Sequence, residues 1–192
     1  MLEYPPIIIC SYLMGSVPFC WILAKEFREV DLRKVGSGNV GATNLSRVAG
    51  VYIALIGLLL DFAKGFIPVF VVIYFHGISL LALIAGFSAV CGHIWSPFLS
   101  FKGGKGVATS LGFITAFDWR IALGAVAVFF ITMLVTKIVS ISSIVASFVL
   151  LPGLILFHKQ WFIVGIVLPI LIIYTHRENI GRLKRGEERS FK

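Results

Sequence analysis

The residues that point most directly to chemistry form a polar loop, Lys102-Gly103-Gly104-Lys105-Gly106, between two strongly apolar segments. Glycine lacks a Cβ, so the backbone can adopt turns in which successive N–H groups point at one spot. Such a concave row of N–H groups binds anions, and the two lysines add positive charge. The loop leads directly into the next apolar helix, whose N-terminal end also attracts anions. The sequence therefore predicts a phosphate site at the membrane surface, with a flexible turn between helices as the alternative.

A second glycine-rich stretch covers residues 36–47 and reads GSGNVGATNLSR. It contains a GxGxxG pattern, but a charged segment and not an apolar strand precedes it, so we do not interpret it as a dinucleotide site. Its side chains offer several hydrogen-bond donors, and the Arg47 guanidinium can bind a phosphate through two parallel bonds. The alternative is a loop that only caps the helix after it. We expect the stretch to bind an anionic ligand through Gly36, Ser37, Gly38, Asn39, Gly41, Thr43, Asn44 and Arg47.

Three ionisable residues lie inside apolar segments, where such residues usually have a function. Asp61 and Lys64 are three positions apart and therefore share one face of a helix. Lys64 would help to hold an anion while Asp61 orients it, or the pair would simply neutralise itself as a structural tie. His93 lies about two helical turns before the first glycine loop. It is a candidate site residue, with a hydrogen-bonded packing residue as the alternative.

A further polar cluster follows the last apolar segment and contains His176, Glu178 and Asn179. A plain membrane flank needs only basic residues, so the added histidine, acid and amide predict a contribution to the site. Three serines in another turn could contact the ligand, although helix capping explains them more simply: Ser140, Ser142 and Ser143.

Several kinds of site do not fit the sequence. Lys105 is followed by Gly106 and not by Ser or Thr, so this is not a nucleotide-binding P-loop. Carboxylates near the glycine loops are too few for a two-metal site, and a serine nucleophile elbow is missing. The His-x4-Asp motif of the soluble-type glycerolipid acyltransferases is missing as well. We therefore expect no metal and no cofactor, and without a basic face interleaved with aromatics we expect no nucleic acid.

The elements that must position these residues are membrane-spanning helices. The chain has 192 residues, 58% of them hydrophobic, with a mean hydropathy of +0.98. The three cysteines lie in apolar runs and are interpreted as buried hydrophobes. An alternative has five spans and a re-entrant hairpin over 107–136. We expect an all-α polytopic membrane protein with one domain over residues 1–192 and seven spans, at about 5–24, 51–75, 79–100, 107–117, 121–136, 141–157 and 160–175.

Charge placement predicts the orientation of these spans. Basic residues follow the first, third, fifth and seventh segments, whereas the opposite loops carry only Arg120 and Lys159. The positive-inside rule then puts the N-terminus outside and the C-terminus in the cytoplasm. Because Glu3 and no basic residue precedes the first span, we expect that span to be retained. Residues 25–34 are predicted to form a short amphipathic helix at the interface.

Five stretches together resemble one family, the bacterial acyl-phosphate:glycerol-3-phosphate acyltransferases (the PlsY family). They are GSGNVGATN with Arg47, DFAKG at 61–65, GHIWSPF at 92–98, KGGKGVAT at 102–109 and HRENIGRL at 176–183. The resemblance covers essentially the whole chain and shows no departure at the motif positions. It implies a compact seven-helix protein of the bacterial inner membrane, with its active site facing the cytoplasm.

The resemblance also implies a reaction and its partners. A fatty acyl group moves from acyl phosphate to the 1-hydroxyl of glycerol 3-phosphate, which yields lysophosphatidate and inorganic phosphate for phospholipid biosynthesis. Neither acyl-CoA nor acyl carrier protein is expected as the direct donor, and the partners are the two substrates and membrane lipid. Because the polar loops lie on one predicted side and no repeat is visible, we prefer this enzyme to the alternative, a membrane anion transporter or channel.

On this interpretation the two glycine-rich stretches hold the two phosphates beside an apolar groove, and N–H groups and cations stabilise the developing charge. Lys105, the loop glycines and Ser37 would hold the acyl phosphate. The histidines would act as acid–base or hydroxyl-orienting groups, unless the substrate phosphate itself takes the proton. The glycerol 3-phosphate ligands would be Arg47, Asn39, Thr43, Lys102 and Asn179, and the expected catalytic residues are Ser37, Arg47, Lys105, His93 and His176.

Overall fold

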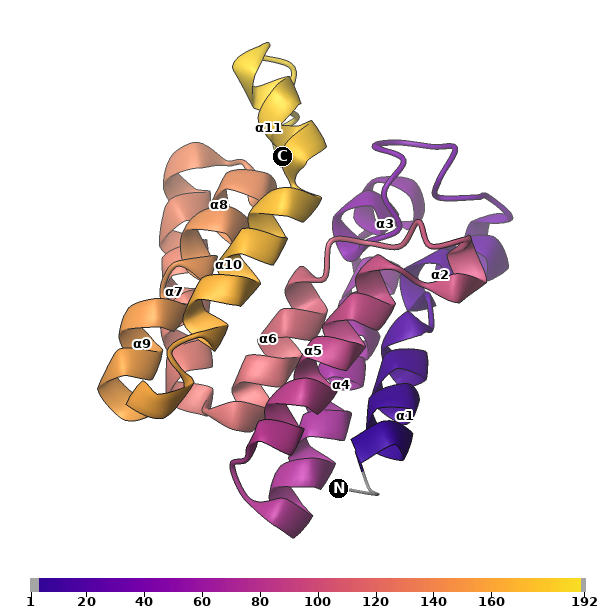
Figure 1. The fold of residues 1–192 in the computed structure, drawn as a ribbon. Coiled ribbons are helices and arrows are strands. Elements are labelled where there is room, and N and C mark those ends of the chain that lie inside the picture. The colour runs from indigo at the N-terminus through magenta and orange to yellow at the C-terminus, as the bar shows by residue number, and fades with distance from the viewer. Residues whose placement is uncertain (1–3, 191–192) are drawn as a thin grey trace. The chain divides into compact units, whose positions relative to one another are not determined.

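The computed structural model describes residues 4–190, and every regular element within that range is a helix. The chain divides into two compact units, Met1–Phe117 and Asp118–Lys192, which are described separately below (Figure 1). The all-α prediction is confirmed for the described residues. The prediction of a single domain stays a prediction.

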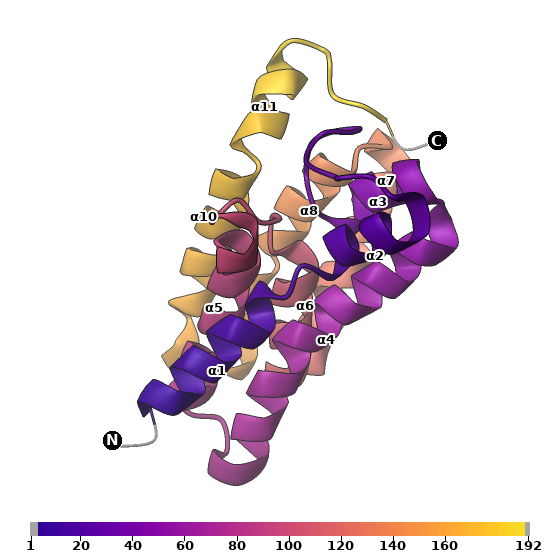
Figure 2. The same ribbon diagram turned by 90° about the vertical axis from the view of Figure 1, so that its right-hand side faces the viewer.

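The first unit is built around a long helix, α4, which packs against α5 and α6. The N-terminal helix α1 lies along α5, as the rotated view shows (Figure 2). Ser79 caps α5, because its side chain accepts a hydrogen bond from the backbone N–H of Ala82. The bounds are α1 Tyr4–Ser16, α2 Phe19–Arg28, α3 Ala42–Ala49, α4 Val51–His76, α5 Leu80–Ile94, a 3-10 turn at Pro97–Leu99, and α6 Val107–Phe117.

The predicted first span is broken between α1 and α2, next to Pro18. Proline has no N–H and cannot continue the hydrogen-bond ladder, so carbonyl groups are left open at the break. Two side chains from elsewhere in the unit donate to carbonyls at the break. Ser96 Oγ donates to the Ser16 carbonyl at 2.6 Å, and Lys64 Nζ donates at 2.8 Å to the Val17 carbonyl, which also accepts from the Phe19 N–H. The break is therefore stabilised by polar groups that arrive later in the chain.

The second unit begins at Asp118, whose side chain caps α7 by accepting from the Arg120 N–H. The Arg120 guanidinium and His158 Nε2 also bind this carboxylate, at 2.6 and 2.8 Å. The Arg120 side chain beside Asp118 holds the pKa of that carboxyl at about 2. The bounds are α7 Trp119–Thr136, α8 Val139–Ser147, α9 Leu150–Phe157, a 3-10 turn at Lys159–Trp161, α10 Val164–Thr175 and α11 Arg177–Lys184.

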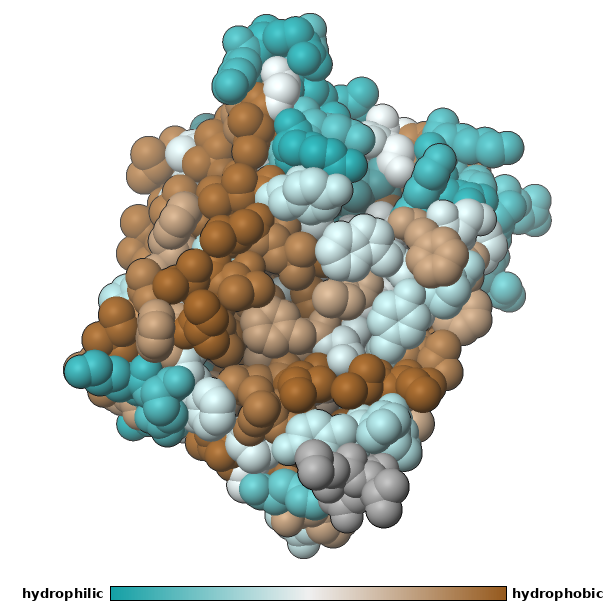
Figure 3. Space-filling model, in the orientation of Figure 1, coloured by the Kyte–Doolittle hydropathy of each residue, from teal (hydrophilic) through white to brown (hydrophobic). Residues whose placement is uncertain are grey.

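Five helices within residues 4–190 are long and apolar enough to cross a membrane, and a sixth if the bent segment Lys159–Lys184 counts as one span. All seven predicted segments are helical, but Val107–Phe117 is short on its own. In the second unit, hydrophobic residues cover α8–α10 and hydrophilic residues gather at α11 (Figure 3). A membrane protein of several apolar helices is confirmed, while the count of seven stays a prediction.

The amphipathic helix predicted for residues 25–34 is wrong in its extent. Helix α2 ends at Arg28, and Glu29 adopts a left-handed conformation with φ 56°. Beyond it, the Asp31 carboxylate accepts from the N–H and the guanidinium of Arg33 and from Trp21 Nε1. A short side chain that binds nearby backbone in this way competes with the helix, so the chain turns into a loop.

Candidate active site

The loop over residues 36–41 is held in shape by one amide, that of Asn44. Its Oδ1 accepts from the Ser37 N–H at 2.9 Å, and its Nδ2 donates to the carbonyls of Leu32, Val35 and Asn39. The side chain is only 1% exposed. Gly36 has φ +63°, and a Cβ there would collide with Asn44 Oδ1, which explains the glycine. Asn44 therefore positions the loop, and its predicted direct contact with a ligand is not supported.

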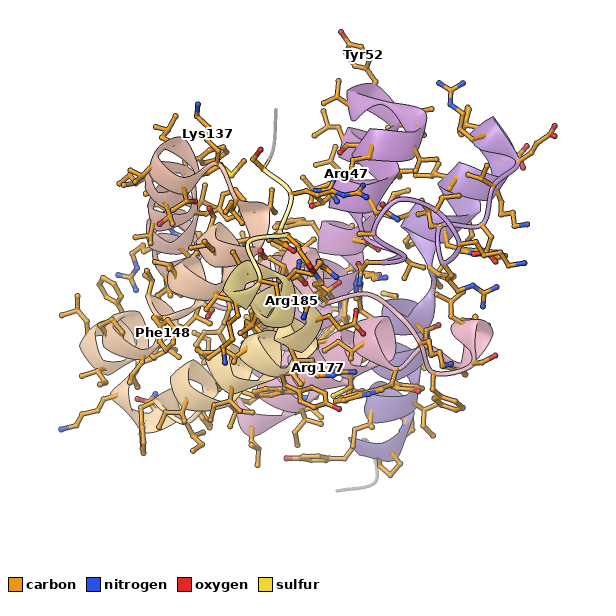
Figure 4. All side chains as sticks on the ribbon, turned by 90° about the horizontal axis from the view of Figure 1, so that it is seen from above. Arg47, Tyr52, Lys137, Phe148, Arg177 and Arg185 are labelled. Atoms are coloured by element: carbon orange, nitrogen blue, oxygen red, sulfur yellow. The ribbon has the colours of Figure 1, made fainter. Side chains whose placement is uncertain are left out.

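Other polar groups of this stretch remain at least partly accessible. Ser37, Asn39 and Thr43 are half-buried, and Arg47 is exposed on α3 (Figure 4). Helix α3 begins after Gly41 and α4 after Gly50, and neither N-terminus has a side-chain cap. The alternative reading of the stretch as a helix cap is therefore wrong. What remains is a braced loop that carries hydroxyl and amide groups, with a guanidinium one and a half turns into α3.

The Lys102–Gly106 loop folds back on the end of α5. The N–H of Gly103 donates to the Ile94 carbonyl at 2.9 Å, and the N–H of Gly104 donates to the His93 carbonyl at 3.0 Å. These two N–H groups are therefore used internally, so the prediction that they point into an anion site is wrong. The part of the loop suited to an anion is its second half, because Lys105 and Gly106 lead into the first turn of α6, where N–H groups lack intrahelical partners.

His93 lies beneath this loop and is buried. Thr109 Oγ1 donates its proton to the Asp61 carbonyl at 2.9 Å, so it can only accept from His93 Nδ1, which is 3.0 Å away. A neutral His93 then carries its proton on Nδ1 and has its lone pair on Nε2. A Cβ at Gly104 would collide with that Nε2, so the ring lies directly against the loop. His93 braces the glycine loop from below.

Asp61 and Lys64 form a buried ion pair beside His93, with 2.8 Å between Oδ1 and Nζ. The approach is ionic and not an aligned hydrogen bond, since Oδ1 has no aligned donor among the described residues. Cys20 Sγ donates to Asp61 Oδ2 at 3.2 Å, and Lys64 also binds the carbonyl of Val17. The geometry favours the structural-tie alternative for this pair, because it joins α4 to the break between α1 and α2.

His176 lies at the junction of α10 and α11 in the second unit and is 2% exposed. Its Nδ1 is 2.8 Å from the Ile172 carbonyl, which can only accept, so Nδ1 carries the proton. The basic nitrogen of a neutral His176 is therefore Nε2. Glu178, two residues on, is exposed in the first turn of α11.

Glu188, which was not predicted to be a site residue, accepts hydrogen bonds from several polar groups of this unit. Its Oε1 accepts from Ser140 Oγ at 2.9 Å and from Asn179 Nδ2, and its Oε2 accepts from Arg182 Nε at 2.7 Å. Ser142 and Ser143 bond instead to carbonyls of their own helix. Helix α8 has no side-chain cap, so capping does not explain Ser140. Arg177 is the first residue of α11 and Arg185 follows its last (Figure 4).

Comparison with known proteins places this chain. Residues 6–186 match the family model described as glycerol-3-phosphate acyltransferase. The chain belongs to this family. The glycerol-3-phosphate acyltransferase of Prochlorococcus marinus (strain MIT 9215) is 42% identical over 187 residues, with 95% of this chain and 94% of that protein covered. Glycerol-3-phosphate acyltransferase 2 of Thermotoga maritima is 41% identical over 182 residues, covering 94% of this chain and 93% of its own.

Two solved structures of PlsY, an integral membrane glycerol 3-phosphate acyltransferase, have the same fold. The glycerol 3-phosphate form matches with a TM-score of 0.94 at 40% identity, covering 99% of this chain and 96% of that one. The lysophosphatidic acid form matches with a TM-score of 0.91 at 38% identity. The family suggested by the five motifs is therefore confirmed, and this member of the glycerol-3-phosphate acyltransferase family is a bacterial membrane protein of phospholipid biosynthesis.

Proposed function

We propose that this protein transfers a fatty acyl group from acyl phosphate to the 1-hydroxyl of glycerol 3-phosphate, and that it releases lysophosphatidate and inorganic phosphate. The observation that carries the proposal is the full-length likeness to PlsY, solved in a glycerol 3-phosphate form and a lysophosphatidic acid form. Lysophosphatidic acid is glycerol 3-phosphate with one added acyl chain, so the two forms correspond to the substrate and the product of a single acylation. The location that goes with it is the bacterial inner membrane, with seven spans, an external N-terminus and a cytoplasmic site.

The choice of acyl phosphate as donor rests on the chemistry of the residues. Phosphate is already a good leaving group, so the protein needs no covalent nucleophile, and none of the usual nucleophile motifs is found in the sequence. What the reaction needs is stabilisation of charge on the carbonyl oxygen and on the departing phosphate. Lys105, Gly106 and the first turn of α6 supply a cation and N–H groups for this, with Ser37 as a further donor.

We assign the binding of glycerol 3-phosphate to cationic and amide groups, each because of the hydrogen bonds it can form. Arg47 can grip a phosphate through two parallel hydrogen bonds, and Asn39 and Thr43 offer smaller donors. Lys102 adds an exposed positive charge, and Asn179 a buried amide donor. We assign His93 and the Asp61–Lys64 pair to support of the loop, whereas Glu178 remains a candidate for contact with the glycerol hydroxyls.

In the reaction the acceptor oxygen attacks the acyl carbon, the new ester bond forms, and the bond from the acyl carbon to the phosphate oxygen breaks. The hydroxyl proton leaves with the phosphate, which departs protonated. His176 orients the hydroxyl through Nε2 and does not keep the proton. His176→Ala should therefore lower kcat while the shape of its pH–rate profile stays that of the wild type. Loss of an inflection from that profile would show that His176 is the general base.

Phosphate release from purified protein in detergent tests the function itself. Palmitoyl phosphate and glycerol 3-phosphate are supplied together and each alone, with palmitoyl-CoA as a separate donor. We expect phosphate release only with both substrates. An acyl-CoA donor would release CoA and no phosphate, so the CoA ester is tested by assaying lysophosphatidate and free CoA, and we expect neither. Lys105→Ala should abolish phosphate release, while Lys34→Ala, which removes an exposed lysine without an assigned role, should not. Turnover with palmitoyl-CoA would refute the proposal that acyl phosphate is the donor. If folded protein turned over neither donor, the proposed acyltransferase activity would be refuted.

A further inference from the structure

The turn between α5 and the Lys102–Gly106 loop displays three aromatic rings on the surface of the first unit. Trp95, Phe98 and Phe101 are 38%, 61% and 61% exposed, whereas Leu99 is only 2% exposed. Lys102, the next residue after these rings, is exposed as well. The candidate membrane span that contains α5 ends at Leu99. The three rings therefore lie where this span meets the membrane surface.

The backbone of this turn is held by hydrogen bonds from within the unit. Ser96 Oγ donates to the Ser16 carbonyl at 2.6 Å. Tyr12 Oη donates to the Trp95 carbonyl at the same distance. The Phe101 N–H closes the turn by donating to the Ser96 carbonyl at 2.8 Å. The rings are thus carried by a braced turn and not by a loose loop.

Phe101 has a backbone conformation that aromatic residues rarely adopt. Its φ is +61°, in the left-handed region that is strained for residues with a Cβ. Among residues 4–190, the other non-glycine residues with positive φ are Glu29, Ser100 and Lys137, and each lies at the end of a helix, where this conformation is common. A glycine after Ser100 would close the same turn without strain. The ring of Phe101 therefore needs an explanation of its own.

Packing within the protein does not supply this explanation, because most of Phe101 is exposed. Strain of this kind persists where function requires it. Aromatic rings at the end of a span fit the boundary between lipid headgroups and acyl chains, and an adjacent lysine fits the phosphates of anionic lipid. We propose that Trp95, Phe98 and Phe101 form an aromatic wedge that inserts at this boundary in an anionic leaflet, and that the wedge fixes the depth of the Lys102–Gly106 loop.

A fixed depth matters because the two substrates come from different phases. Glycerol 3-phosphate is dissolved in water, whereas a long-chain acyl phosphate is an amphiphile that lies in the leaflet with its phosphate among the headgroups. A loop held at headgroup depth therefore helps the second substrate to bind and not the first. This consequence rests on the proposed function, because it takes acyl phosphate as the donor, whereas the lipid contact of the wedge does not.

Photo-cross-linking of the full-length protein tests the lipid contact. The photoreactive residue p-benzoylphenylalanine is introduced in place of Phe98 or Phe101, and in place of Lys34 as an exposed control outside the wedge. In vesicles of equal parts phosphatidylglycerol and phosphatidylcholine, we expect lipid adducts at both wedge positions, with phosphatidylglycerol in excess, and few at the control position.

Three results of the cross-linking would overturn the proposal. They are lipid adducts no more frequent at the wedge than at the Lys34 position, adducts with a second copy of the chain in place of lipid, and equal yields of the two lipids. Because the readout needs no turnover, it is decided separately from the proposed acyltransferase activity.

Kinetics in the same vesicles test the effect of depth. The double variant Phe98→Asn and Phe101→Asn should raise the KM for palmitoyl phosphate about tenfold, the lower end of the loss for one aromatic side chain returned to water. The KM for glycerol 3-phosphate and the kcat should stay unchanged. Phe75→Asn removes a similarly exposed ring near the end of α4 and should behave as wild type. An unchanged KM for palmitoyl phosphate, or an equal rise in both KM values, would contradict the wedge.

A stability measurement separates a wedge from a ring that supports the fold. Asparagine tolerates the left-handed conformation, so Phe101→Asn should leave the unfolding midpoint in detergent at or above that of wild type. Ser100→Asn makes the matching change without removing a ring, and it should keep the wild-type KM for palmitoyl phosphate. A midpoint lowered by more than about 3 °C in Phe101→Asn would assign the ring to the fold and overturn the proposal.

Discussion

Replacement of Lys64 by methionine should destabilise the protein strongly while it leaves side-chain size almost unchanged. The Lys64 and Asp61 side chains are each 3% exposed, and Lys64 Nζ lies 2.8 Å from both Asp61 Oδ1 and the Val17 carbonyl. Removal of the cation leaves a buried carboxylate without its counter-charge, a change that typically costs about 3–5 kcal/mol. The lost hydrogen bond from Lys64 to the Val17 carbonyl belongs to the same loss and is not added separately.

The measurement is thermal unfolding in detergent, followed by circular dichroism. At about 2–4 °C of midpoint shift per kcal/mol for a chain of this size, Lys64→Met should lower the midpoint by about 6–20 °C. The matched control is Lys34→Met, which changes an exposed lysine in the same way and should shift it by less than about 2 °C.

A double variant shows whether the loss belongs to the ion pair. Asp61→Asn in the Lys64→Met background removes the orphaned charge, so the double variant should be more stable than Lys64→Met alone. The reasoning is refuted if Lys64→Met unfolds within about 3 °C of wild type, or if Asp61→Asn adds a full further loss.

Three further predictions follow from described contacts. Asn44→Ala removes the four hydrogen bonds that brace the first glycine-rich loop, and thermal unfolding should show a loss of about 2–4 kcal/mol; an unshifted midpoint would contradict the clamp. Gly104→Ala should displace the loop from His93 Nε2 and lower acylation about a hundredfold, while Gly181→Ala, whose Cβ would meet only a guanidinium tip, should keep full rate. The Arg120 side chain lowers the pKa of Asp118 from 3.8 to about 2, so the stability that Asp118 contributes is complete above about pH 4 and is lost as the pH falls towards 2. In acid titrations of unfolding, Asp118→Asn should lose less free energy of unfolding over that window than wild type. Parallel curves for the two proteins would contradict this.

The helical elements could be predicted from the sequence because apolar length is a local property. Each of the seven predicted segments corresponds to helix in the structure. The break at Pro18 could not be predicted with certainty, because proline disfavours a helix interior but α4 and α10 continue through Pro68 and Pro169. The end of α2 at Arg28 could not be predicted either, because it depends on the Asp31 carboxylate accepting from Arg33, two residues later, and from Trp21, ten residues earlier.

The site was less predictable because many of its polar groups form hydrogen bonds within the protein and are not directed at a ligand. Composition shows that Asn44 is an amide in a glycine-rich stretch, but not that its four hydrogen bonds all go to residues 32–39. The same holds for Gly103 and Gly104, whose N–H groups are taken by the end of α5. Glu188 had no local signal at all, since one of its partners, Ser140, is 48 residues away.

The break between α1 and α2 constrains how the protein is made. The Ser16 carbonyl receives its side-chain donor from Ser96, 80 residues later. The Val17 carbonyl, which also accepts from the Phe19 N–H, receives Lys64, 47 residues later. At a synthesis rate of about 5–20 residues per second, the first hydrophobic segment leaves the ribosome about 4–16 seconds before its last partner. An unsatisfied backbone carbonyl is costly in lipid. We therefore expect this segment to stay within the insertion machinery until α4 and α5 follow, so that the N-terminal helices enter the bilayer as a group.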